Sequence, residues 1–178
     1  VRVKPDLDLL YLAAESQRFG DVQICMYRDL FIPEQETQFA AMTFLLEDES
    51  MFLAFRGTDY SLTGWKEDFN MSFLAEIPAQ SYSVKYLNIV TGFLNKKFYV
   101  GGHSKGGHLA VYSAALADDK LNSRIESIYN FDGPGFNRDA TESENFRKIQ
   151  GRIVKMIPES SIVGRLLFNA TEPVIVRS

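Results

Sequence analysis

The stretch FYVGGHSKGGHLAVYSAAL, from Phe98 to Leu116, is the part of the sequence from which the fold is predicted. Its apolar beginning ends at a pair of glycines, and a second glycine pair opens a segment with the composition of a helix. Ser104 stands between the two pairs, and Gly102 and Gly106 complete a G-x-S-x-G pattern around it. The pattern predicts a strand that turns directly into a helix at this serine.

Such a corner holds its serine in a strained backbone conformation, and neighbouring glycines permit the close packing that this requires. The hydroxyl then stands at the start of a helix, where the helix dipole favours a developing negative charge. We therefore interpret Ser104 as a nucleophile. The alternative is a glycine-rich helix start with a serine N-cap. A phosphate-binding loop is excluded because G-x-x-x-x-G-K-S/T has no match in the sequence.

Apolar runs alternate with helical patterns along most of the chain, and no linker divides it, so we expect one domain over residues 1–178. This alternation predicts an α/β fold with a mostly parallel sheet and helices on both faces. The motifs RGTD, GHSKGG and FDGPG follow predicted strands, and sites in such sheets gather at the carboxyl ends of the strands. We expect helices over 5–19, 78–93 and 104–119, and strands over 37–46, 51–57, 96–102, 123–131, 151–157 and 173–177.

Composition excludes several classes of function. The 178 residues are 46% hydrophobic, enough for a sizeable core, and the net charge of −4 disfavours nucleic acid as a partner. Cys25 is the only cysteine, so no internal disulfide forms, and with two histidines it cannot build the usual zinc site. We expect no metal and no cofactor. The start of the chain has no signal-peptide pattern, and we expect a cytoplasmic protein.

The motifs together resemble a known family. FRGT at the end of one strand, W-x-x-D shortly after it and GHSxGG further on are similar to the class 3 lipases, α/β-hydrolases of the fungal triacylglycerol lipase type. The chain resembles even more a group of bacterial lipase-like proteins of unassigned function, over roughly residues 38–167. The shared segments are QFAAMTF, AFRGTD, GGHSKGGHLAVY, NFDGPGF and IPESSIVG. The resemblance implies an α/β-hydrolase fold, a small-molecule or lipid ester as substrate and transient contact with a lipid surface.

The resemblance also implies roles for residues around the serine. Thr58 matches the oxyanion-hole residue, which offers a backbone N–H and a hydroxyl, and Lys105 would supply the second backbone N–H. Asp68 matches a carboxylate that steadies the Thr58 hydroxyl, and Arg56 resembles a structural residue that anchors this loop. Without the resemblance, Thr58 and Asp59 could cap a turn and Asp68 could be a solvated helix charge.

Two further hypotheses concern the charge of the substrate and its access to the site. The Lys105 ammonium would favour a substrate with an anionic group. Residues 63–78 would form part of a lid, although burial of the same side chains in the core fits equally well. The apolar face of this lid would comprise Trp65, Phe69, Met71, Phe73 and Leu74.

A serine nucleophile needs a base, usually a histidine that a carboxylate orients. His103 precedes Ser104 on a tight corner and would point away from it, and His108 lies one turn into the helix, along its flank. In α/β-hydrolases the chain order is serine, acid, histidine. We therefore expect the base after residue 178, in a chain that is C-terminally incomplete here. A non-catalytic scaffold that binds a lipid or a protein partner is the alternative function.

Two residues are candidates for the acid, Asp132 in FDGPG and Glu159 in IPESSIVG. The D-x-V-P segment that carries the acid in class 3 lipases aligns with residues 160–163, where a serine takes its place. Asp132 could instead be a turn residue and Glu159 a helix N-cap. The sequence leaves the choice between them open.

Overall fold

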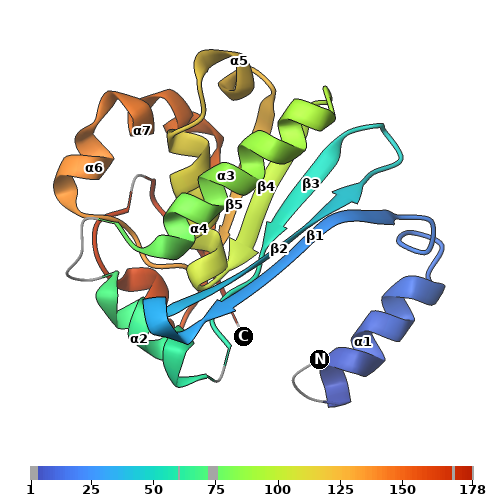
Figure 1. Cartoon of the computed structure of the whole chain (residues 1–178), viewed down its shortest axis with the longest axis horizontal. Coiled ribbons are helices and arrows are strands. Elements are labelled where there is room, and N and C mark those ends of the chain that lie inside the picture. Colours follow the sequence, from blue (N-terminus) through green and yellow to red (C-terminus); the bar gives the residue numbers. More distant parts are fainter. Residues whose placement is uncertain (1–3, 60, 72–75, 170, 178) are drawn as a thin grey trace.

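The structure is a computed structural model that describes residues 4–59, 61–71, 76–169 and 171–177. Figure 1 shows its helices and strands, with α1 apart from the other helices. In chain order they are α1 (Lys4–Glu15), β1 (Gln23–Ile32), η1 (Pro33–Gln35), β2 (Thr37–Leu45), β3 (Met51–Phe55), α2 (Leu62–Asn70), α3 (Pro78–Phe93), β4 (Phe98–His103), α4 (Lys105–Ala115), α5 (Asp119–Asn122), β5 (Ile125–Phe131), α6 (Arg138–Glu142), α7 (Glu144–Ile149), η2 (Gln150–Arg152), β6 (Ile153–Pro158), η3 (Val163–Arg165) and β7 (Val174–Val176).

The sheet is mixed and mostly parallel. Its seven strands lie in chain order, β1 to β7, with β1, β2 and β3 antiparallel and β3 to β7 parallel. The expected strands, including the β2–β3 hairpin, are confirmed. No helix of the described segments is both long and apolar enough to cross a membrane.

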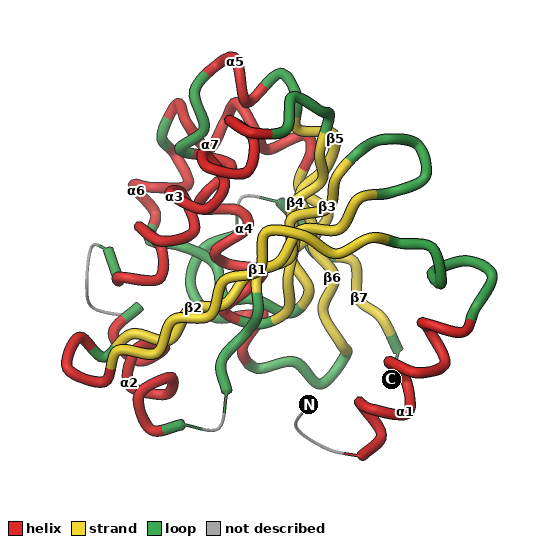
Figure 2. Tube along the Cα trace, turned by 45° about the vertical axis from the view of Figure 1, so that its right-hand side comes forward, coloured by secondary structure: helices red, strands yellow, loops and turns green. Residues whose placement is uncertain are grey.

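The helices cover the two faces of the sheet unequally. Figure 2 shows α3, α4, α6 and α7 on one side of the strands and α1 on the other. The expectation of helices on both faces is therefore met only in part, because none of the described residues of α1 is buried. Strand order explains this: right-handed crossovers that always step in the same direction place their helices on one face.

The covered face forms the core. Met51, Leu53 and Phe55 alternate inward from β3 and are almost fully buried, and Leu109 of α4 packs in the same cluster. Burying each side chain of this size stabilises the fold by roughly 1.5–3 kcal/mol. The outward residues of the same strand, such as Phe52, are only half-buried.

Strand β1 was not expected from the sequence. It pairs with β2 along most of its length, but its register shifts between Cys25 and Arg28, and Met26 in this bulge has a φ of 53°. As the edge strand it leaves most of its side chains exposed. The alternation of apolar and polar residues that predicts a half-buried strand is therefore missing from Gln23–Ile32.

Helix α4 approaches the end of β3 more closely than side chains would allow. A Cβ on Gly106 would lie 2.1 Å from the carbonyl oxygen of Phe55, and a Cβ on Gly102 would lie 2.4 Å from the same atom. Glycine is therefore required at both positions for α4 to start where it does.

A buried ion pair fixes the same end of α4. The Lys105 ammonium lies 2.7 Å from Glu67 of α2, and both side chains are fully buried. Lys105 also donates to the backbone and side-chain oxygens of Gln38 in β2. Glu67 accepts from the backbone N–H groups of Gln38 and Ala79, the latter in α3. The pair thus joins β2, α2, α3 and α4, and its polar atoms are satisfied as burial demands.

Gly106→Ala should destabilise the protein by about 1–3 kcal/mol, because the added methyl group overlaps the Phe55 carbonyl. Gly92→Ala is the matched control, since a Cβ at this helical position meets nothing within 4 Å. The control should gain about 0.5–1 kcal/mol from helix propensity. Urea denaturation of both variants measures the difference, and equal stabilities would contradict the close approach.

Glu67→Gln and Lys105→Met should each destabilise the protein by about 3–5 kcal/mol, because each leaves a buried partner unpaired. The double variant should lose clearly less than the sum of the two. The surface pair Lys97–Glu126, whose glutamate is half-buried, is the control, with an expected coupling of at most about 1 kcal/mol. Additive losses at Glu67 and Lys105 in the denaturation cycle would show that the two charges are not paired.

Candidate active site

Ser104 lies at the corner between β4 and α4. Its φ of 55° and ψ of −127° lie in a region that a serine rarely adopts. The backbone N–H donates to the carbonyl of Phe131 in β5 at 2.9 Å, and the carbonyl accepts from Gly107 at 2.9 Å. The half-buried side chain makes no hydrogen bond with any described residue and does not cap the helix. The corner thus has the strained geometry that the sequence pattern predicts, and its hydroxyl does not cap the helix.

The loop after β3 lies directly against this corner. A Cβ on Gly57 would lie 3.4 Å from the Cβ of Ser104 and 2.6 Å from the carbonyl oxygen of His103. The next residue, Thr58, donates its hydroxyl to Asp68 Oδ2 at 2.5 Å. Burial raises the pKa of Asp68 above its ordinary value, and its other oxygen is buried without a partner among the described residues. The structure therefore brings Thr58, Asp68 and Ser104 to one end of the sheet.

The backbone and the side chain of Lys105 lie in different surroundings. Its backbone N–H is at the first position of α4 and donates to no backbone carbonyl of a described residue. Its side chain points inward to Glu67 and is fully buried. The hypothesis that the ammonium selects anionic substrates is therefore wrong, because the charge is neutralised inside the protein and cannot reach a ligand.

Arg56 lies on the exposed side of the β3 end. Its guanidinium makes paired hydrogen bonds of 3.2 and 3.3 Å with Asp29 of β1. Its backbone N–H donates to Ala40 of β2. These contacts fix the end of β3, from which the Gly57–Thr58 loop departs.

The two acid candidates differ in how they are held. Asp132 follows β5 with a φ of 54°, and its Oδ1 accepts from the Ser161 hydroxyl and from the Gly164 N–H. Glu159 is exposed, and its side chain makes no hydrogen bond or ion pair with a described residue. Ser161 and Gly164 were not singled out from the sequence, where a serine pair followed by apolar residues carries no strong signal.

Lys155 is a further buried residue that sequence reasoning missed. It donates to the carbonyl of Gly133 at 2.8 Å and to the side chain of Asn169. Burial lowers its pKa to about 8, and the charge of Asp132 opposes this shift. In the sequence this lysine lies within the apolar strand segment RIVKMI, and nothing in that segment indicates that it lies near the site.

The two histidines lie in different surroundings. His103 is exposed, whereas His108 is buried and stacks on Phe136 with ring centroids 4.0 Å apart. The side-chain amide of Gln80 lies 2.8 Å from His108 Nε2, which must accept, since an amide nitrogen can only donate. Nδ1 then carries the proton and donates to Gly135 at 3.1 Å. Burial lowers the pKa of His108 to about 4, so the ring is neutral.

The proposed lid segment is only partly described. Phe73 and Leu74, and the side chains of Trp65 and Phe69, lie outside the described residues. Met71 packs against the core. Glu67, in the middle of α2, belongs to the buried ion pair. Moving α2 as a lid would therefore break that pair.

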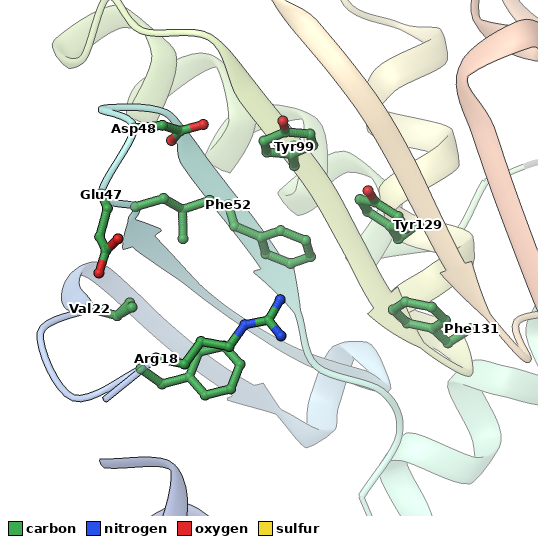
Figure 3. Close-up of a pocket in the computed structure, with 10 residues that line it drawn as sticks. Arg18, Val22, Glu47, Asp48, Phe52, Tyr99, Tyr129 and Phe131 are labelled. Carbon is green, nitrogen blue, oxygen red and sulfur yellow. The ribbon is translucent and has the colours of Figure 1, made fainter. Parts of the chain in front are cut away.

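A cavity of about 540 Å³ lies on the open face of the sheet. Figure 3 shows its aromatic wall along neighbouring strands and its opposite side, formed by the segment after α1. None of the predicted site residues lines it. Its described lining comprises Arg18, Phe19, Val22, Leu46, Glu47, Asp48, Phe52, Tyr99, Tyr129 and Phe131.

The neutral form of His108 should make stability depend on pH. Because its pKa in the folded protein is about 4 and its ordinary value is 6.5, its contribution is complete above pH 6.5 and is lost as the pH falls toward 4. Between pH 7.5 and pH 5 this loss amounts to about 2 kcal/mol. Denaturation of His108→Gln should lack it, while His103→Gln keeps the wild-type drop. An unchanged drop in His108→Gln would refute the assignment.

Several solved lipase structures are similar to this chain. A fungal lipase–inhibitor complex matches 80% of the chain at 18% identity and a TM-score of 0.60, and M37 lipase matches 85% at 20% identity and 0.58. The match with Rhizomucor miehei triacylglyceride lipase covers 99% of this chain and 82% of the lipase chain, at 15% identity and a TM-score of 0.60. The chain spans only 60% and 58% of the first two. At these identities the likeness shows the fold alone.

The sequence comparisons give a family. No curated protein sequence matches the chain. A family model described as Mbeg1-like matches residues 13–178, nearly the whole length. The chain therefore belongs to the Mbeg1-like family, with an α/β-hydrolase fold like that of lipases.

Proposed function

We propose that the protein is a serine hydrolase that acts on acyl esters, with Ser104 as the nucleophile. The observation that carries the proposal is the backbone of Ser104, at a φ of 55° on a strand-to-helix corner. Such strain persists where the surrounding structure enforces it, and it is concentrated at functional sites. Here the glycines that enforce it are Gly102 and Gly106, whose contacts leave no room for a side chain.

The oxyanion hole is proposed to consist of the backbone N–H groups of Thr58 and Lys105. Attack of the Ser104 oxygen on an ester carbonyl would place negative charge on the carbonyl oxygen, beside the start of α4. Amide donors and the helix dipole stabilise such a charge, and one donor typically contributes a factor of 10² to 10³ in rate. Asp68 holds the Thr58 hydroxyl, and Arg56 fixes the end of β3 from which this loop departs. The buried Lys105 side chain fixes the start of α4.

A base must take the proton from Ser104. His108 has both ring nitrogens engaged and is buried. His103 is the last residue of β4, directly before Ser104, and its side chain is exposed. We therefore assign the base to neither histidine of this chain, and a carboxylate, Asp132 or Glu159, would orient whichever base serves. Because the base is not assigned, functional tests should use the natural full-length protein.

Fold and site together support a proposed class of substrate. One similar structure is named a triacylglyceride lipase, which supports a lipid or small-molecule ester here. Exposed apolar side chains near the same end of the sheet, such as Ile162 and Phe168, fit transient contact with a lipid surface.

A fluorophosphonate probe should label full-length wild-type protein at Ser104, and Ser104→Ala should abolish labelling. Ser123→Ala, a change of an exposed serine, is the matched control and should label like wild type. Mass spectrometry of the labelled peptide locates the adduct. An adduct on another serine, or a folded wild type that does not react, would refute the nucleophile and favour a non-catalytic scaffold.

A further inference from the structure

Asp132 is fixed more firmly than a surface carboxylate at a turn. Its backbone N–H donates to Met156 of β6 at 2.8 Å, which ties the turn to the neighbouring strand. Its φ of 54° is left-handed, a conformation that costs free energy for any residue with a side chain. The turn therefore holds the carboxyl group in one direction at the end of β5.

Among the described residues, hydrogen-bond donors reach one oxygen of this carboxylate. The Ser161 hydroxyl and the Gly164 N–H both donate to Oδ1, the latter at 3.2 Å. Oδ2 makes no hydrogen bond with any residue within the described segments. Ser161 is 8% exposed, and its oxygen also accepts from the Gly164 N–H at 3.0 Å. The three groups form a closed cluster that anchors Oδ1 and makes no hydrogen bond with Oδ2.

The surroundings allow little movement of this cluster. A Cβ on Gly164 would lie 2.5 Å from Asp132 Oδ1 and 2.6 Å from Ile157, so the loop packs directly on the carboxylate. Beneath the turn, the buried Lys155 ammonium donates to the carbonyl of Gly133. Gly133 itself packs on the start of α4, where a Cβ would lie 2.6 Å from the Ser104 carbonyl oxygen. The carboxylate and the serine thus belong to one rigid assembly.

We propose that Asp132 is the acid of the catalytic triad and that Ser161, with the Gly164 N–H, is its positioning residue; this rests on the proposed function. A triad carboxylate must keep one oxygen directed at the N–H of the base, where it fixes the tautomer and stabilises the cation that forms. Oδ2 of Asp132 supplies that oxygen, because Oδ1 is anchored. Glu159 lacks any such anchor.

The test uses full-length protein and p-nitrophenyl butyrate as the substrate. Asp132→Asn should lower kcat by about 10⁴ with KM nearly unchanged, because the amide favours the wrong tautomer. Asparagine tolerates a positive φ, so this variant should fold. Glu159→Gln should stay within twofold of wild type. A large loss in Glu159→Gln and none in Asp132→Asn would overturn the assignment.

Ser161→Ala should lower kcat by about 10- to 100-fold, a typical loss for partners that orient a functional group. KM should stay within about threefold, and Ser161→Thr should restore most of the rate because it keeps the hydroxyl. Ser160→Ala, at the exposed neighbouring serine, is the matched control and should be unaffected. Unchanged kcat in Ser161→Ala, or a loss that Ser161→Thr does not restore, would refute the positioning role.

Thermal unfolding separates this proposal from the proposed function. Asp132→Asn and Ser161→Ala should each lower Tm, and the double variant should fall less than the sum, whether or not the protein hydrolyses the ester. A wild type without activity but with this coupling would refute the hydrolase and with it the catalytic role of the pair. Additive Tm losses in an active protein would refute the Asp132–Ser161 contact alone.

Discussion

The approach of α4 to the carboxyl end of β3 is the constraint on which the rest of the structure depends. Gly102 and Gly106 bring the backbone of the corner against the Phe55 carbonyl, and Ser104 takes the left-handed conformation that results. The inward side chain of Lys105 then locks the start of the helix through Glu67. One residue thus contributes its side chain to stability and its backbone N–H to the proposed oxyanion hole.

Most of the fold followed from local pattern, because the strands on the covered face bury one set of alternating residues and end at glycine-rich turns. This is why β2 to β6 and α3 to α4 were predicted close to their observed bounds. Strand β1 was missed because an edge strand with a bulge exposes most of its side chains. Helix cover on both faces was expected from alternation, but strand order, which local pattern does not contain, decides the faces.

The candidate site was predictable where backbone geometry dictates residue type. Glycines around Ser104, and the Thr58–Asp68 pair, come together as the motifs suggested. Interactions between distant side chains were not predictable: Lys105 looked solvent-facing in sequence, yet it pairs with Glu67, 38 residues away. The contact of Asp132 with Ser161 also depends on the pairing of β5 with β6, which no single segment encodes.

A crystal structure of full-length protein inactivated by a fluorophosphonate would show the geometry at Ser104 itself. We expect a bond from phosphorus to Ser104 Oγ, with the phosphoryl oxygen about 2.7–3.1 Å from the backbone nitrogens of Thr58 and Lys105. Phosphorus bonded elsewhere, or a phosphoryl oxygen that points away from both nitrogens, would contradict it.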